Sequence, residues 1–321
     1  LAKQGLYFPN TMQSFNATAG SVFSTVTGFH KISFDEKTKR FTSSELNAYY
    51  GSLPHILGNT EYEHYYFGGF RQSALDFLRF MGNQGYKTYG YESLSERLKK
   101  KGKFSAADST LGLFDQAFLT ESALILNEAN RHYTAHLVTS TSHSPWSIPE
   151  NASTHFNVPA LNAFAYVDQA IQAFMQVLAK KPERFADTLF VFVADHSSYT
   201  FNDDLLETIR IPLIFYTPSK SLKLPRKKLE TIASHVDIIP SVLSLLHGEH
   251  QHSGMGSSLF TQQRTGSALS GSRYHGIYAK QGYMFQFLPY EEENKLSQLH
   301  NSTQNRTITQ KNIDEIIATS K

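Results

Sequence analysis

Two kinds of apolar pattern alternate along the chain: short β-favouring runs, and longer stretches with apolar residues at helical spacing. Strands are predicted over 62–67, 133–139, 188–194 and 212–216, and helices over 17–27, from 115, over 159–180 and from 237. The helix over 159–180 has the clearest pattern, with one apolar stripe predicted to face the core: Leu161, Phe164, Val167, Ile171, Phe174 and Leu178. The alternation predicts an α/β fold, with a mainly parallel sheet sandwiched by helices.

Two acidic residues stand where predicted helices begin. Asp115 precedes an apolar helical pattern, and Asp237 precedes Ile-Ile-Pro240. Asp is favoured at the N-cap, and Pro is tolerated in the first helical turn. We therefore expect both carboxylates to cap their own helices.

The texture of the chain changes beyond about residue 262, where Ser, Gly, Gln and Asn become frequent. Strand-like pieces occur at 276–279 and 283–288, and a short helix is predicted near 312–318. The expected organisation is a large domain over 1–262 and a small C-terminal α+β subdomain over 263–321.

Composition sets the outer limits. The 321 residues carry a formal net charge of +2, which gives no reason to expect a nucleic-acid partner. The absence of cysteine excludes disulfides, thiolate metal sites and cysteine nucleophiles. No apolar run approaches the roughly 20 residues that span a bilayer. Because the chain opens on Leu1 and not on Met, we expect it to be a fragment, with any targeting segment upstream.

The apolar run over 188–194 leads directly into Asp195 and His196. Such a run is typical of a strand buried on both faces, and open α/β sheets bind ligands beyond the carboxyl ends of their strands. A carboxylate beside an imidazole suits a divalent cation. The alternative is a strand end whose polar residues only cap the next turn.

Thr18 lies at the predicted start of a helix, within Asn16-Ala-Thr18-Ala-Gly20-Ser21. One interpretation is a plain N-cap. The other is a nucleophile, whose developing alkoxide is favoured by the helix N-terminus and a neighbouring cation.

Two histidines also have two interpretations each. His143 follows a predicted strand, in Ser-His143-Ser-Pro. It is either a loop residue bonded to a backbone carbonyl or a donor to a phosphoryl oxygen or leaving group. His235, just before a predicted helix, either orients the chain there or lies at the edge of a site.

The order of these segments resembles a known family. Leu-Ala-Lys-Gln-Gly-Leu-Tyr-Phe, Thr18, Ser-His143-Ser-Pro, Ala-Asp195-His196 and the stretch from His235 to Pro240 follow one another as in the lipoteichoic acid synthase branch of the sulfatase and alkaline phosphatase superfamily. The resemblance covers roughly residues 1–262 and includes Gly254-Met-Gly256-Ser-Ser-Leu at its end.

The resemblance implies roles for individual residues. Thr18 matches the family's metal-bound nucleophile, Asp195 and His196 match two metal ligands, and His143 matches a residue that contacts the phosphoryl group. The implied metal is one Mn²⁺ or Zn²⁺ ion. The family's first strand, which ends in a glutamate ligand, would lie before Leu1.

Two stretches depart from the family's patterns. The stretch that matches the substrate loop reads Phe67-Gly-Gly-Phe-Arg71, without the histidine and Trp-x-Arg of polyglycerolphosphate synthases. Arg71 is the substrate-binding residue that this stretch offers. The Cys/Ser-x-Pro-x-Arg setting of formylglycine sulfatases is missing, which weighs against sulfate ester hydrolysis.

The implied activity is transfer of a phosphoryl group from a phosphoglycerol- or phosphoethanolamine-type lipid donor to an envelope acceptor, through phosphothreonine. The expected partner is a lipid-linked or glycan phosphodiester at the outer face of the cell membrane, reached through the region upstream of Leu1. Two alternatives are an ester hydrolase of the sulfatase or phosphatase type, and a non-catalytic relative that binds glycans.

Overall fold

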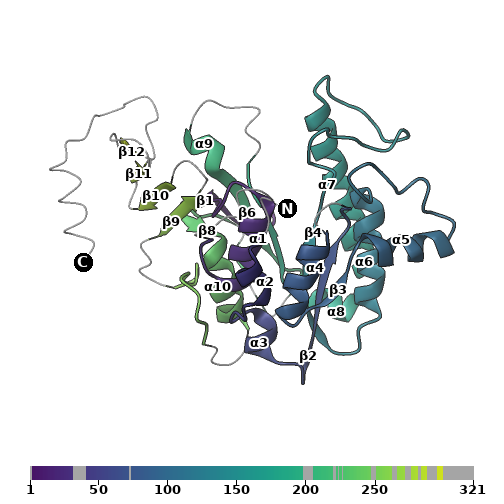
Figure 1. Ribbon diagram of the computed structural model, residues 1–321, viewed down its shortest axis with the longest axis horizontal. Helices are drawn as coiled ribbons and strands as arrows, with labels where there is room; N and C mark the ends of the chain where they lie inside the picture. The colour runs from purple at the N-terminus through teal and green to yellow at the C-terminus, as the bar shows by residue number, and fades with distance from the viewer. Residues whose placement is uncertain are drawn as a thin grey trace. The chain divides into compact units, whose positions relative to one another are not determined.

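The computed structural model describes residues 2–31, 41–71, 74–197, 205–219, 222, 224–225, 227–246, 251–261, 266–271, 276–280, 283–287 and 295–298. The chain forms two compact units, which we describe separately (Figure 1). The first unit comprises Leu1–Lys39, Leu189–Thr217 and Ser221–Lys321. The second comprises Arg40–Thr188 and Pro218–Lys220.

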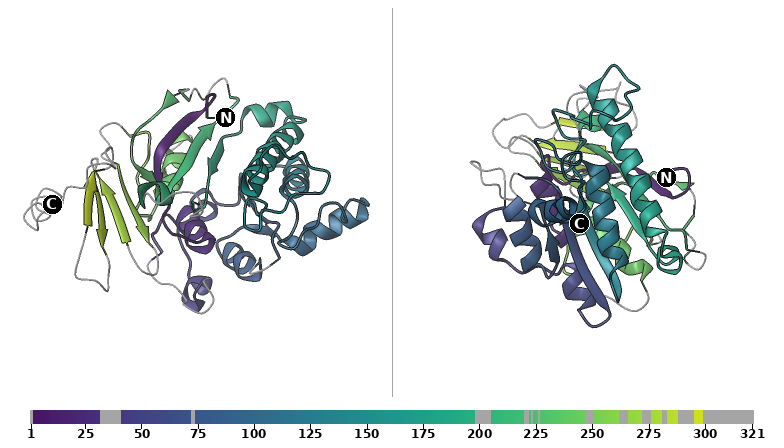
Figure 2. Two further views of the ribbon diagram at one scale, coloured as in Figure 1. Left: turned by 90° about the horizontal axis from the view of Figure 1, so that it is seen from above. Right: turned by 90° about the vertical axis from the view of Figure 1, so that its right-hand side faces the viewer.

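The first unit is built on a sheet in the order β5-β6-β1-β7, with β8 also paired to β1. Its strands are β1 (Leu6–Met12), β5 (Phe190–Val193), β6 (Arg210–Tyr216), β7 (Lys227–Lys228) and β8 (Ala233–Ser234). Strand β6 runs antiparallel to both β5 and β1, whereas β7 and β8 run parallel to β1. Figure 2 shows β1 in purple among these later, green strands. The sheet is therefore mixed. A buried apolar run such as 188–194 does not indicate whether the neighbouring strand is parallel or antiparallel.

The helices of this unit are α1 (Thr18–Thr27), α9 (Leu205–Ile209), the 3₁₀ turn η1 (His235–Asp237) and α10 (Ile238–Leu245). Helix α1 ends at Gly28, whose φ of 73° is the left-handed conformation that favours glycine at a helix end. Apolar side chains of the sheet, of α10 and of the segment after α10 form one buried cluster: Leu6, Phe8, Leu213, Phe215, Ala233, Ile238 and Leu259.

The first unit also contains an antiparallel sheet in the order β12-β11-β10-β9. Its strands are β9 (Ser267–Gly271), β10 (Gly276–Lys280), β11 (Tyr283–Phe287) and β12 (Lys295–Gln298). The strands predicted over 276–279 and 283–288 are thus present. The helix predicted near 312–318 lies outside the described residues, and the domain boundary near 262 stays a prediction.

The second unit is built on a parallel sheet in the order β3-β2-β4. Its elements are α2 (Ser43–Asn47), α3 (Leu53–Leu57), β2 (Tyr62–Gly68), α4 (Ala74–Asn83), β3 (Lys87–Tyr89), α5 (Tyr91–Lys100), α6 (Asp115–Asn127), β4 (His132–Val138), α7 (Pro159–Leu178) and α8 (Pro182–Ala186). Helices α6 and α7 lie side by side (Figure 1). The carboxyl ends of all three strands lie at one edge, because the strands are parallel.

The prediction of which face of α7 is buried is partly wrong. Leu161 and Phe164 are 39% and 38% exposed, whereas the buried residues are Ala160, Asn162, Ala163, Tyr166, Ala170, Phe174 and Leu178. Small residues such as alanine let a helix pack closely against its neighbour. Apolar residues lie on two faces of α7, and helical periodicity alone does not tell which face is buried. The predicted stripe consists of the larger apolar side chains.

Neither predicted capping acid bonds an N–H of its own α-helix, although Asp237 completes a capping box with Ser234 in the preceding 3₁₀ turn. Asp115 is the first residue of α6, after the N-cap Phe114, and its carboxylate bonds the loop after β4. Asp237 is the N-cap of α10 but makes no side-chain cap bond there. Its two carboxylate oxygens accept from the N–H groups of Ser234 and Ser257 at 2.9 and 3.0 Å. A sequence pattern places an acid at a helix start without telling which N–H groups it will reach.

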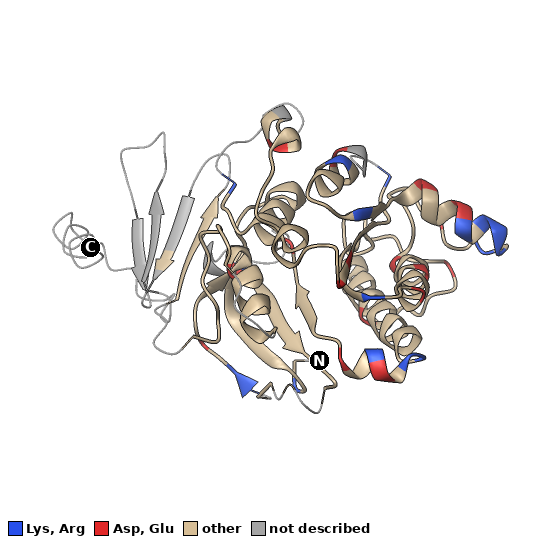
Figure 3. Cartoon of the chain, turned by 90° about the horizontal axis from the view of Figure 1, so that it is seen from below, with Lys and Arg blue, Asp and Glu red and all other residues tan. Residues whose placement is uncertain are grey.

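Helix α5 carries its charges in the order that favours the helix dipole. Glu92 lies in the first turn, and Arg97, Lys99 and Lys100 lie in the last (Figure 3). No helix in the described part of the chain combines the length and apolar character that crossing a membrane requires.

Candidate active site

The mixed sheet of the first unit brings three segments to one edge. Strands β1 and β5 both run opposite to β6, and β8 runs with β1, so all three end on the same side. The residues that follow them are Gln13 to Thr18, Ala194 to His196, and His235 to Asp237. The expectation that Asp195 and His196 lie beyond the carboxyl end of their strand is met, although the neighbouring strand is antiparallel.

Thr18 is the first residue of α1 and not its N-cap. The N-cap is Ala17, which makes no side-chain cap bond. The Thr18 hydroxyl instead donates to Oδ2 of Asp195 at 2.6 Å. The N-cap interpretation is therefore wrong, and the side chain is directed at the acid of the strand edge.

Local sequence explains how Thr18 reaches this position. A Cβ on Gly20 would lie 2.4 Å from the ring of Phe15, so only glycine lets this turn pack against that ring. The Ser21 hydroxyl donates to the Phe15 carbonyl at 2.9 Å. Gly20 and Ser21 thus fix the chain that leads from β1 into α1, and Thr18 with it.

Asp195 is the centre of this cluster. Its Oδ2 lies 2.6 Å from Oγ1 of Thr18 and 3.5 Å from Nε2 of His196. Its Oδ1 accepts from the backbone N–H of His196 at 2.9 Å. The Asp195 and His196 side chains are 37% and 25% exposed, so solvent and ligands reach both.

The hydrogen bond of His196 determines its tautomer. Nδ1 lies 3.0 Å from the Ser197 carbonyl, which can only accept, so Nδ1 carries the proton in the neutral ring. The lone pair is then on Nε2, on the side of Asp195. Metal-binding histidines use this arrangement, with one N–H on a carbonyl and the other nitrogen free.

These donors fit a divalent cation in chemical type. A carboxylate, an imidazole nitrogen and a hydroxyl converge within the distances given above, and these are donor types that bind divalent cations. Across the described residues, no group of three or more His, Cys, Asp or Glu gathers in this way. Among the described residues of this cluster, the Thr18 hydroxyl is the further oxygen donor beside Asp195.

Loop positions on this edge are fixed by Gln13 and His235. Gln13 accepts through Oε1 from the Ser197 N–H at 2.8 Å. His235, 1% exposed, accepts at Nδ1 from the Ser14 N–H at 3.0 Å, and its Nε2 donates to the Ala194 carbonyl at 2.9 Å. It thereby joins the ends of β1 and β5, which favours the orienting interpretation. Gln13 gave no signal in the sequence, since one glutamine after a strand is unremarkable.

Burial lowers the pKa of His235 to about 4. The Ala194 carbonyl and the Asp195 carboxylate act in the opposite direction but do not offset the burial. The ring is therefore neutral near pH 7, which is the form that its two hydrogen bonds require.

The Gly254-Met-Gly256 motif packs against the same segment. A Cβ on Gly256 would lie 1.9 Å from the Val236 carbonyl oxygen, and the Met255 N–H donates to the Gly28 carbonyl at 2.7 Å. The motif thus closes the first unit over η1 and the end of α1, and its glycines have a packing role.

The second unit carries the other two candidate residues. His143 is exposed in the loop after β4, where its N–H donates to the Ser140 carbonyl at 3.0 Å. Its Nδ1 lies 2.6 Å from the Ser144 carbonyl and therefore carries a proton. To donate a hydrogen bond through Nε2 as well, the ring must be in the doubly protonated form.

Arg71 follows β2, so it lies at the same edge of the parallel sheet as the His143 loop. Its guanidinium pairs with Asp108, donates to the Ser109 carbonyl at 3.2 Å and lies 4.2 Å from the ring centre of Tyr91. The side chain is 40% exposed. The structure thus shows protein partners for this cation, and its role in substrate binding stays a prediction.

The model of the Sulfatase family matches residues 1–248, more than three quarters of the chain. The chain belongs to the Sulfatase family. Membership supports an enzyme of the hydrolase or transferase kind.

Two curated relatives are both named as lipoteichoic acid synthases. Lipoteichoic acid synthase 1 of Bacillus subtilis is 24% identical over 243 residues, which are 66% of this chain and 36% of that protein. Lipoteichoic acid synthase of Staphylococcus saprophyticus is 26% identical over 219 residues, which are 61% of this chain and 32% of that protein. The chain thus spans about a third of the length of the curated relatives it matches.

Solved structures agree on the fold. The lipoteichoic acid synthase LtaP from Listeria monocytogenes superposes with a TM-score of 0.80 at 18% identity, covering 99% of this chain and 81% of that one. A protein of the alkaline phosphatase superfamily from Vibrio parahaemolyticus gives 0.78 at 18% identity, covering 100% and 79%. The predicted α/β fold of the alkaline phosphatase and sulfatase type is confirmed.

Proposed function

We propose that this protein transfers a phosphoryl group from a phosphodiester to an alcohol, with Thr18 as the nucleophile. The observation that carries the proposal is the 2.6 Å hydrogen bond from the Thr18 hydroxyl to Asp195, made in place of a helix cap. This bond orients Oγ1 and gives its proton an acceptor. The start of α1 additionally favours negative charge as the alkoxide develops.

The bonds made and broken balance in two steps. The Oγ1 oxygen of Thr18 attacks phosphorus, its proton goes to Asp195, and the bond from phosphorus to the first alcohol breaks. The resemblance assigns His143 to the transferring group, where its doubly protonated ring would supply the proton that the departing alkoxide takes. An acceptor hydroxyl then attacks the phosphothreonine, its proton goes to His143, and Thr18 recovers its own proton.

A divalent cation belongs to this proposal, since members of the superfamily generally use one. Asp195, His196 and Thr18 would hold it. When bound, it would lower the pKa of the Thr18 hydroxyl and neutralise charge on the phosphoryl oxygens. We propose Mn²⁺ or Zn²⁺ from the oxygen and imidazole donors.

The proposed donor is a lipid-linked phosphodiester of the phosphoglycerol or phosphoethanolamine type, and the proposed location is the outer face of the cell membrane. Support for both comes from the names of the two curated relatives, which are lipoteichoic acid synthases. Hydrolysis is the alternative outcome if water replaces the acceptor alcohol. Products formed from bis-p-nitrophenyl phosphate with and without glycerol distinguish transfer from hydrolysis.

Substitution of Thr18 tests the nucleophile. Thr18→Ala should abolish turnover of bis-p-nitrophenyl phosphate, while Thr18→Ser keeps the oxygen and part of the activity. Thr18→Ala should cost about 1.5–3 kcal/mol of folding free energy, because the lost hydrogen bond ends on a carboxylate, and the low end is expected because the Asp195 side chain is 37% exposed. Rapid quenching followed by peptide mass spectrometry should find the phosphoryl adduct on Thr18.

The same helix offers a matched control. The Thr25 hydroxyl donates to the Ser21 carbonyl within α1 at 2.8 Å and is not part of the strand edge. Thr25→Ala should therefore keep full turnover. Normal turnover by Thr18→Ala, with no adduct in the native protein, would end the covalent proposal.

A further inference from the structure

In the second unit, the segment that joins α5 to α6 crosses the loop after β2. The Leu113 N–H donates to the Gly69 carbonyl at 2.9 Å, and the Arg71 N–H donates to the Leu111 carbonyl at 2.8 Å. Between them, a Cβ on Gly112 would lie 2.2 Å from the Gly69 oxygen, and the φ of Gly112 is 146°. Only glycine allows this close crossing.

The same segment ends at Asp115, which bonds the loop after β4. One carboxylate oxygen accepts from the Ser140 N–H at 2.9 Å, and the other accepts from the Thr141 N–H at 3.1 Å. The Asp115 N–H donates to Oγ1 of Thr141 at 2.9 Å. Three hydrogen bonds thus join one residue to the start of the loop that carries His143.

The Asp115 carboxylate contributes more to the position of the loop than to the stability of the fold. Asp115 is fully buried, and burial raises its pKa to about 6 despite the Ser140 and Thr141 bonds. A buried charge recovers its desolvation cost only partly, so such a group contributes little net stability. What it does supply is geometry, because its two oxygens fix two successive backbone N–H groups.

The fixed residues continue to His143. Asp115 accepts from the backbone N–H of Ser140. The carbonyl of the same residue, Ser140, accepts from the backbone N–H of His143 at 3.0 Å. The His143 carbonyl in turn accepts the Trp146 N–H at 2.8 Å. A chain of hydrogen bonds therefore runs from Asp115 through Ser140 into the turn that presents the imidazole.

We propose that Asp115 is a positioning residue for His143, acting through the backbone of Ser140 and Thr141. The crossing segment before it also pairs Arg71 with Asp108, so one stretch of chain sets two side chains at the same edge of the parallel sheet. The inference rests on the proposed function, in which His143 acts on the transferring phosphoryl group.

A double-mutant cycle tests this role. Asp115→Asn keeps the size of the side chain but turns an NH₂ group toward one of the two N–H donors. Misplacement of a catalytic group by 1 Å can cost about 10²-fold in rate, so kcat on bis-p-nitrophenyl phosphate should fall by about that factor. In the His143→Ala background, Asp115→Asn should cause no further fall, because the residue that it positions is gone.

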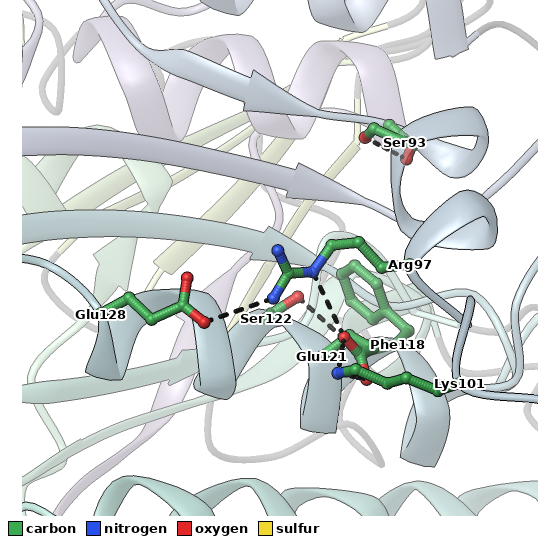
Figure 4. Close-up of polar contacts among 8 residues, drawn as sticks. Ser93, Arg97, Lys101, Phe118, Glu121, Ser122 and Glu128 are labelled. Atoms are coloured by element: carbon green, nitrogen blue, oxygen red, sulfur yellow. Dashed lines mark hydrogen bonds and ion pairs between the residues drawn. The ribbon is translucent and has the colours of Figure 1, made fainter. Parts of the chain in front are cut away.

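Glu121 provides the control on the same helix. The Glu121 carboxylate pairs with Lys101 and Arg97 (Figure 4). The two nitrogen–oxygen distances are 2.7 and 3.4 Å, and Glu121 is 3% exposed. Glu121→Gln should lower the thermal midpoint yet leave kcat per folded molecule unchanged. The ring ¹⁵N signals of His143 should move in Asp115→Asn and stay in place in Glu121→Gln.

A second pair of variants covers the case in which Asp115→Asn does not fold. Thr141→Val removes the acceptor of the Asp115 N–H, whereas Thr141→Ser keeps it. Thr141→Val should lower kcat only when His143 is present, and Thr141→Ser should behave like the native protein.

The outcomes separate the two proposals. If His143→Ala alone keeps native turnover, the role of His143 in the proposed function fails. If His143→Ala loses activity but Asp115→Asn lowers kcat equally in both backgrounds, the function stands and the positioning role is overturned. Unmoved His143 signals in Asp115→Asn would overturn it as well.

Discussion

His235 should make the folded protein sensitive to acid. Its ring is 1% exposed and holds the Ser14 N–H and the Ala194 carbonyl, each on a different nitrogen. A second proton would sit on Nδ1 and face the Ser14 N–H, so two donors would oppose each other. Protonation therefore breaks the link between the ends of β1 and β5.

The direction and size of the effect follow from the pKa. Burial lowers the pKa of His235 from 6.5 to about 4, so between these values the unfolded chain binds a proton that the folded chain does not. The stabilisation is fully present above pH 6.5 and is lost as the pH falls toward 4. The gap between the two pKa values corresponds to about 3 kcal/mol.

Urea unfolding of the native protein and His235→Gln, with chelator present, measures this contribution. Glutamine does not titrate, so the difference in unfolding free energy between the two proteins should shrink by about 3 kcal/mol between pH 7 and pH 4. Other shifted groups, such as His64 and Asp115, are common to both proteins and cancel.

An exposed histidine supplies the control. His132 opens β4 with its side chain exposed, and His132→Gln should change the unfolding free energy little at any pH. A gap between native protein and His235→Gln that stays constant across the pH range would refute the account of His235.

Two further predictions concern the metal and the closing motif. Asp195→Ala should remove most of the bound divalent ion, and full metal occupancy by elemental analysis would contradict this. The circular dichroism spectrum should stay native, because the Asp195 side chain is 37% exposed and lies outside the core. Gly256→Ala should lower stability by about 1–3 kcal/mol, as overpacking does, because its Cβ would meet the Val236 carbonyl at 1.9 Å. Gly82→Ala is the matched control in thermal unfolding, since a Cβ there meets nothing within 4 Å in α4; equal midpoints for both variants would refute the packing argument.

The position of Asp195 and His196 beyond a strand could be predicted from the sequence, because open α/β sheets bind ligands at the carboxyl ends of their strands. In such sheets, an apolar run that ends at a polar pair predicts a site beyond that strand. The rule does not predict the hydrogen bond between Thr18 and Asp195, which the sequence connects only through the family resemblance. The direction of β6 was not accessible, because apolar periodicity is the same for parallel and antiparallel neighbours.

The buried groups that hold the loops were much harder to predict. Asp115 stands at a helix start, where the local rule favours a cap, yet its carboxylate bonds residues 25 and 26 positions later. The buried face of α7 differs from the predicted one for a related reason, since its buried positions include three alanines whereas the larger Leu161 and Phe164 are exposed. In each case a tertiary contact outweighs a local preference that the sequence displays clearly.

The strand edges of the two units are braced by buried ionisable groups of opposite kinds. His235 must stay neutral to bond the ends of β1 and β5, and its pKa is lowered to about 4. Asp115 bonds the loop after β4 as a carboxylate, and burial raises its pKa to about 6 from 3.8. As the pH rises from about 4 to 6, His235 adds stability, whereas Asp115, increasingly ionised in a buried place, removes it. The two contributions have opposite signs over this range, so His235→Gln and Asp115→Asn should change the slope of the unfolding free energy against pH in opposite directions.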